Sequence, residues 1–109
     1  MTRAAPADLD RVLAALADPT RRRLLDLLGR HPGSTATTLA AHLPVSRQAV
    51  VKHLVVLEGS RLVVGHRAGR EVLFRVRPER LAAAGSWMTG LAATWEERLD
   101  LRKRKAEGG

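Results

Sequence analysis

Two helical segments joined by a connection of only a few residues constrain this fold more than any other feature of the sequence. The second segment, Ser46–Arg61, places Val50, Leu54 and Leu57 four and three residues apart, which is the spacing of one face of a helix. Its first residue is a suitable N-cap, and Pro44, two residues earlier, opposes an earlier helical start. The segment therefore predicts an amphipathic helix with one buried face.

The exposed face near the start of this helix carries side chains that suit the edge of a nucleic-acid duplex. Gln48 can donate and accept hydrogen bonds in one plane, and Arg47 and Lys52 can reach guanine or phosphate; Val51 lies among them. The preceding segment, residues 34–42, is a short predicted helix. Two helices joined by a short turn, the second polar near its start, form a helix-turn-helix pattern. For the second segment alone, an ordinary solvated surface helix is the alternative.

Two more helices are predicted before this pair. Leucine and valine at helical spacing predict a helix over residues 7–17. Asp18 and Pro19 then start a second helix, as an N-cap followed by proline at the first helical position, and Gly29 is expected to end it. Residues 21–23 are all arginine. Because cations in a first turn oppose the helix dipole, they serve either a phosphate backbone or an ordinary solvated face.

After the helix from residue 46, the hydrophobic period changes from helical to alternating. Two short β-prone runs, 62–67 and 71–76, flank a turn that contains glycine and predict a β-hairpin. Its tip and flanks carry Arg67 and Arg70, with His66 beside them. A hairpin is too small to be stable alone, so it must dock on the helices. A helix-turn-helix with an adjacent basic hairpin is a winged helix-turn-helix.

The last segment predicts a helix over residues 78–105 whose apolar stripe is larger than a small domain can cover. We expect this helix and the helix over residues 7–17 to form a two-fold homodimer interface. The expected interface residues are Leu9, Leu13, Leu81, Trp87, Met88, Leu91, Trp95 and Leu99. Packing of the last helix against the first within one chain is the alternative.

Composition favours a nucleic-acid partner and argues against several other classes. The formal net charge of +8 favours a polyanion, such as nucleic acid or an anionic membrane surface. The absence of cysteine rules out disulfides, thiolate metal sites and cysteine catalysis. No apolar run approaches the roughly 20 residues of a membrane span, and the N-terminal residues are too polar for a signal peptide. We expect a single domain over residues 1–109, cytoplasmic and associated with the nucleoid rather than with a membrane.

Two long strings carry a family resemblance, ALADPTRRRLLDLL (residues 15–28) and TTLAAHLPVSRQAVVKHLVVLE (37–58), together with the hairpin that follows. They resemble the ArsR family of bacterial winged-helix repressors, and the similarity runs from about residue 9 to residue 95. The later segment TWEERLDLRKR resembles a branch of the family that lacks metal-binding cysteines. The resemblance implies a mainly helical fold of four helices, a two-stranded hairpin and a fifth helix. It also implies a dimeric transcriptional regulator.

The resemblance also implies residue roles. The recognition helix would be Ser46–Gly59, reading a pseudo-palindromic operator as a repressor. The expected DNA contacts are Thr37, Thr38, Ser46, Arg47, Gln48, Val51, Lys52, His66, Arg67 and Arg70. Two positions depart from the family pattern: Val51 stands where a small polar residue is usual, and Ser60-Arg61 where a small residue with glycine is usual. These departures change the expected operator, so no known operator sequence carries over.

Neither a metal, a cofactor nor a catalytic residue is expected. The four histidines fall on different predicted elements and lack the tight spacing of a helical metal pair. The sequence has no acid pair, Ser-His-Asp arrangement or phosphate loop with workable spacing, so we do not expect an enzyme. Three alternatives stay open: a nonspecific nucleoid-type DNA-binding protein, a protein-interaction winged helix, and control by an unidentified small-molecule effector near Trp87, Met88 and Trp95.

Overall fold

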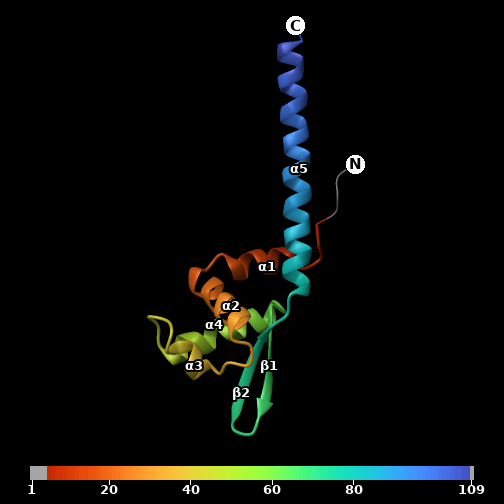
Figure 1. The fold of residues 1–109 in the computed structure, drawn as a ribbon. Coiled ribbons are helices and arrows are strands. Elements are labelled where there is room, and N and C mark those ends of the chain that lie inside the picture. Colours follow the sequence, from red (N-terminus) through yellow and green to blue (C-terminus); the bar gives the residue numbers. More distant parts are fainter. Residues whose placement is uncertain (1–4, 109) are drawn as a thin grey trace.

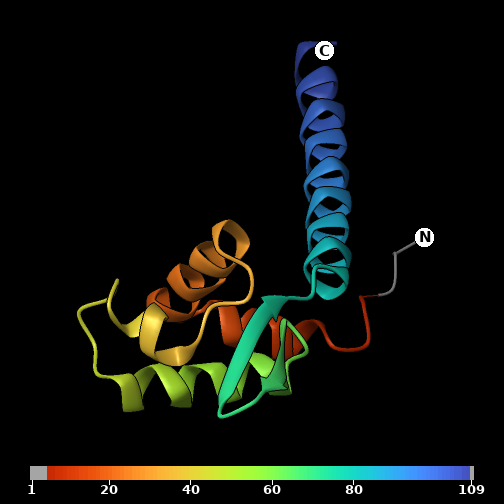
Figure 2. The same cartoon turned by 60° about the horizontal axis from the view of Figure 1, so that its bottom comes forward.

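The computed structural model describes residues 5–108, whose elements follow the order of a winged helix-turn-helix (Figures 1 and 2). The elements are α1 (Leu9–Leu16), α2 (Pro19–Arg30), α3 (Ala36–Ala40), α4 (Arg47–Gly59), β1 (Val63–Ala68), β2 (Glu71–Val76) and α5 (Glu79–Glu107). The predicted fold, mainly helical with one small hairpin before the last helix, is confirmed.

Side-chain caps fix where three of the helices begin. One carboxylate oxygen of Asp18 accepts hydrogen bonds from two backbone N–H groups in the first turn of α2, at 2.8 and 3.1 Å. The hydroxyl oxygens of Thr35 and Ser46 each accept one backbone N–H, at 3.1 Å, at the starts of α3 and α4. These N–H groups have no partner within the helix, so each cap satisfies a donor that the helix itself leaves open.

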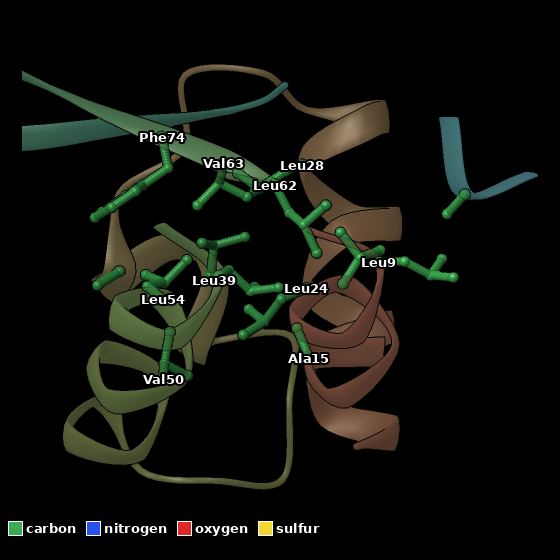
Figure 3. Packing of buried hydrophobic residues seen from close by; sticks show 14 residues of the cluster. Leu9, Ala15, Leu24, Leu28, Leu39, Val50, Leu54, Leu62, Val63 and Phe74 are labelled. Atoms are coloured by element: carbon green, nitrogen blue, oxygen red, sulfur yellow. The ribbon is translucent and has the colours of Figure 1, made fainter. Parts of the chain in front are cut away.

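The hydrophobic core lies where the first four helices meet the hairpin (Figure 3). The three apolar residues predicted on the inner face of α4, Val50, Leu54 and Leu57, are all buried. Figure 3 shows them facing side chains of α2 and α3, and Phe74 of β2 reaches in from the hairpin. Burial of this face therefore fixes which side of α4 points outward.

The hairpin is held against the helices by a short extension of its sheet. β1 and β2 pair antiparallel, with Val63 opposite Val76. Gly69 at the tip has a φ of +63°, a left-handed backbone that glycine adopts with the least strain. The loop before α3 bridges to β2, where the Phe74 N–H donates to the Ser34 carbonyl at 2.9 Å. This bridge fixes the hairpin relative to α3.

α5 leaves the body of the protein as a projecting helix, on the side opposite the hairpin tip (Figure 1). Its first turns pack against α1 through Ala84, and an ion pair of 2.9 Å joins Arg80 to Asp8. From residue 88 to residue 108 every side chain is exposed, and only Gly90 is partly covered. The radius of gyration is 18.9 Å, against about 13 Å for a compact domain of this length. Intrachain packing of α5 against α1 thus accounts for its first turns only.

Some predicted boundaries differ from the structure. α2 continues through Gly29, and the left-handed glycine falls later, at Gly33, with a φ of +85°. α4 ends before Arg61, which is itself left-handed with a φ of +57°. β1 begins after Leu62, because the Leu62 N–H bonds back to α4, at the carbonyl of Leu57, rather than across the hairpin. The turns after α2 and α4 therefore end one or two residues away from where glycine and periodicity placed them.

Candidate nucleic-acid interface

The first turns of α4 present the predicted set of side chains to solvent. Arg47, Gln48, Val51 and Lys52 are all exposed, on the side away from the buried apolar face. Ser46 is exposed as well, but its hydroxyl oxygen accepts the Ala49 N–H and caps the helix. The hydroxyl hydrogen of Ser46 is left to donate, so this residue can serve the cap and a phosphate at once.

A direct hydrogen bond joins α3 to the start of α4. Arg47 Nε donates to Thr37 Oγ1 at 3.0 Å, and the neighbouring Thr38 hydroxyl accepts from Thr35 Oγ1 at the same distance. A guanidinium carries five N–H donors, so one bond to Thr37 leaves the others able to contact phosphate or a base. The helix-turn-helix thus holds Arg47 in a defined direction before any DNA is bound.

A groove separates α3 and the start of α4 from the hairpin. Its lining is formed by Thr35, Ala36, Thr37, Thr38, Arg47, Val51, Arg70, Glu71, Val72 and Phe74. Half of these are predicted DNA contacts, brought together from α3, α4 and the hairpin; Gln48 and Lys52 stand beside the groove on α4. Glu71 was not singled out, although it is the only acidic residue between Arg61 and Arg77. Its carboxylate repels phosphate and so limits how close a backbone can come to this wall.

The hairpin tip is cationic and points away from α5 (Figure 1). Arg67 and Arg70 are exposed there, as expected. His66 is exposed too, but its Nε2 lies 2.9 Å from Nη2 of Arg75 on the paired strand. Arg75, an exposed residue that the sequence reasoning did not single out, therefore shares the face on which His66 was expected to contact DNA.

Two members of the arginine run in α2 have a structural role. Arg21 donates to two carbonyl oxygens in the last turn of α1, at 2.7 and 3.2 Å, and Arg22 donates to the Leu16 carbonyl at 2.7 Å. The last carbonyls of a helix lack intrahelical partners, and cations there suit the helix dipole. These two arginines stabilise the end of α1, which explains their unfavourable place in α2. Arg23, the third, is exposed.

The residues expected at a dimer interface divide into three groups. Leu9 is 5% exposed in the core, so it packs inside one chain and does not belong to the exposed apolar surface expected of it. Leu81 and Trp87 are half-buried against the same core. The remaining residues are exposed: Leu13 on α1, and Met88, Leu91, Trp95 and Leu99 on α5. We call the last four the α5 stripe.

The histidines of the described residues stay apart from one another's elements. Residues 5–108 hold no group of three or more His, Asp or Glu side chains placed to share a metal ion. His53 lies on α4 with its Nδ1 3.4 Å from the guanidinium of Arg21, which packs it between α4 and the end of α1. Across the described part of the chain, each helix is too short or too polar to cross a bilayer.

Known proteins share this sequence and this arrangement. Residues 16–66 match the family described as "Helix-turn-helix domain". The HTH-type transcriptional regulator Rv2034 of Mycobacterium tuberculosis is 45% identical over 74 residues, which cover 68% of either chain. The transcriptional repressor SdpR of Bacillus subtilis is 31% identical over 80 residues, covering 73% of this chain and 88% of the repressor.

The structural match is closer still in its coverage. A solved structure, the ArsR-like transcriptional regulator from Rhodococcus sp. RHA1, shows a TM-score of 0.84 at 40% identity and covers 94% of both chains. The chain belongs to the ArsR family. This ArsR-family protein is therefore a DNA-binding transcriptional regulator and not an enzyme, and the predicted family membership is confirmed. Its two departures from the family pattern fall at telling places, Val51 in the groove and Arg61 at the end of α4.

Proposed function

We propose that this ArsR-family protein is a repressor that binds a pseudo-palindromic operator as a homodimer. The observation that carries the proposal is the groove in which α3, the start of α4 and the basic hairpin meet. A helix with an exposed polar start fits the major groove, and the hairpin beside it reaches the adjacent backbone or minor groove. Within the cytoplasm, such a protein would act on the chromosome.

In this arrangement the contacts divide by chemistry. Gln48 and Arg47 read base edges or hold nearby phosphates, because both side chains form planar sets of hydrogen bonds. Lys52, Thr37 and Thr38 hold the sugar-phosphate backbone and set the register of α4. Arg67 and Arg70 bind phosphate or enter the minor groove from the hairpin tip. Backbone contacts supply most of the affinity, and α4 supplies the sequence preference.

The dimer rests on the α5 stripe. Met88, Leu91, Trp95 and Leu99 recur at intervals of three and four residues and are 43–59% exposed in one chain. A helix that makes no tertiary contact is marginal in water, so the projecting half of α5 needs a partner. A second copy of the same stripe provides one by two-fold symmetry. Two recognition helices would then lie about 34 Å apart, one turn of DNA.

Repression follows from where such a dimer binds. A dimer seated over a promoter occupies the site that RNA polymerase needs. The relative SdpR carries the name of a transcriptional repressor at 31% identity, which supports the same direction of control. An effector bound near Trp87, Met88 and Trp95 would need the partner chain to enclose it, because Met88 and Trp95 are exposed in one chain.

The test is selection of bound duplexes from a random DNA pool at near-physiological salt. We expect an enriched inverted repeat whose half-sites are separated by about one helical turn, 10–10.5 base pairs. Tight binding without any enriched motif would contradict the proposal and indicate a nonspecific DNA-binding protein held by phosphates. A single, unrepeated motif would retain base reading but contradict the two-fold dimer. Repression itself is measured with a reporter gene driven by a promoter that contains the selected repeat.

A further inference from the structure

Three valines are exposed on α4, and the fold gives no reason for them. Val51, Val55 and Val56 are 37%, 63% and 42% exposed. Valine is a poorer helix former than alanine, lysine or glutamate, because its branched side chain is restricted against the preceding turn. An apolar side chain left in water also gains nothing from burial. Their presence on a helix that faces DNA calls for a functional account.

Two of the valines share a face with the base-reading glutamine. Val51 follows Gln48 by three residues and Val55 follows Val51 by four, so the three side chains form one row along the outer surface of α4. Val51 also lines the groove beside the hairpin. Val56 lies elsewhere, in a depression formed with α1 and lined by Arg11 and Ala14 among others. The row consists of one amide followed by two apolar groups.

The major groove offers one apolar feature to such a row, the C5-methyl group of thymine. The adenine of the same or an adjacent A·T pair presents N7 and N6, which a glutamine amide can bond with two hydrogen bonds. Valine has no donor or acceptor, so it cannot hold phosphate. Arg47 and Lys52 flank the row, and their charge suits DNA on this face better than an apolar protein surface.

We propose that Val51 and Val55 read thymine methyl groups in the half-site, beside an adenine that Gln48 reads. This inference rests on the proposed function, because it needs α4 to lie in the major groove. It adds a content to the operator that the family resemblance does not supply: A·T pairs under the row, recognised by apolar contact. The contact at Val51 exists because this chain departs from the small polar residue usual there.

The experiment replaces thymines of the selected operator, one at a time, with deoxyuridine. This change removes the C5-methyl group and keeps every hydrogen-bonding group of the base. Loss of one buried methyl contact should weaken binding roughly fourfold at each thymine that is read. Val51→Ala and Val55→Ala should each bind the unmodified operator more weakly and lose the effect of deoxyuridine at one thymine. Because alanine favours helix more than valine does, both variants should keep the fold.

Val56→Ala is the matched control, since it removes the same two methyl groups from an exposed valine of the same helix. It should keep wild-type affinity and the full pattern of deoxyuridine effects. A selected operator whose thymines all tolerate deoxyuridine would overturn the inference and leave the proposed function standing. So would deoxyuridine effects that persist unchanged in Val51→Ala and Val55→Ala. A pool without an enriched motif would overturn both the inference and the proposed base reading.

Discussion

Arg61 occupies a position that most side chains avoid. α4 ends with two backbone hydrogen bonds, from Arg61 N–H to the Glu58 carbonyl and from Leu62 N–H to the Leu57 carbonyl, each 2.9 Å. This is a Schellman motif, with Leu57 and Leu62 buried against each other's side of the cap. Its left-handed residue is usually glycine, because a Cβ there crowds the following carbonyl. The exposed Arg61 fills it with a φ of +57°.

Arg61→Gly should therefore stabilise the protein. Relief of the left-handed strain outweighs the extra freedom that glycine has in the unfolded chain, for a net gain of about 0.5–1 kcal/mol. Urea unfolding at one fixed protein concentration measures this as a raised midpoint with an unchanged m-value. Arg61→Ala is the control, because it removes the same charge and keeps the strain. Equal midpoints for the two variants would show that the backbone conformation carries no cost.

Asp18 makes the start of α2 sensitive to acid. The Arg21 backbone N–H, and after it that of Thr20, donate to the carboxylate and hold the pKa of Asp18 below its ordinary value, although burial opposes them. A lowered pKa in the folded state means that the ionised cap stabilises above the ordinary carboxyl pKa of about 3.9 and that this contribution is lost as the pH falls through the lowered value.

The matching variant is Asp18→Asn, because asparagine also caps helices but does not titrate. We expect the wild type to unfold at a higher temperature than Asp18→Asn near neutral pH. The difference should shrink as the pH drops below about 4. Thermal unfolding followed by circular dichroism across this range measures it. A difference that stays constant down to pH 2 would rule out the carboxylate cap as the titrating cause.

At the level of elements, local signals predicted what local physics decides. The N-caps at Asp18 and Ser46 and the inner face of α4 follow from neighbours within a few residues, so the sequence sufficed for them. The role of Arg21 did not follow, because its acceptors belong to the end of another helix. The burial of Leu9 was missed for the same reason, since it depends on where the base of α5 lands. The groove needed three elements at once, and only its members, not its shape, could be predicted.

The hairpin and α4 should differ in how they use their side chains. Arg70→Ala should weaken binding to all sequences alike and reduce the salt slope of log K by about 0.9 per phosphate contact, hence about twice that in a dimer. Gln48→Ala should instead cost about 1–3 kcal/mol at the base it reads and leave the salt slope unchanged. Titrations of operator and unrelated duplexes at several salt concentrations separate the two.

Arg104→Ala, which removes an exposed cation from α5, is the control for general electrostatics and should change neither quantity. An effect of Arg70→Ala confined to one base pair would contradict its phosphate role. If Gln48→Ala leaves the preferred sequence intact, the base-reading role of Gln48 is wrong.

At the scale of the whole molecule, the single chain is an incomplete object. The body buries its own core, but the chain extends over 70 Å along its longest axis because α5 projects from it. The apolar side chains of the α5 stripe gain nothing while they face water, and the projecting half of the helix has no tertiary packing to hold it. Association therefore decides both whether this half of α5 stays helical and how far apart two recognition helices lie.

Leu91→Glu tests this dependence. By two-fold symmetry the change places a carboxylate on both copies of the same patch, so it removes apolar contact and adds like charges. We expect a monomer in analytical ultracentrifugation at micromolar concentration, reduced helix content by circular dichroism, and weak binding to the full inverted repeat. Binding to an isolated half-site should persist, because α4 and the hairpin do not depend on α5 for their packing.

Leu101→Glu is the matched control. Leu101 is 57% exposed and lies two residues from Leu99, hence on nearly the opposite side of the helix. It should leave the dimer, its helix content and its affinity for the inverted repeat unchanged. A wild-type protein that is monomeric at micromolar concentration would remove the dimer altogether. Equal losses in Leu91→Glu and Leu101→Glu would mean instead that any charge on α5 disturbs the helix, and that the α5 stripe has no special place in the assembly.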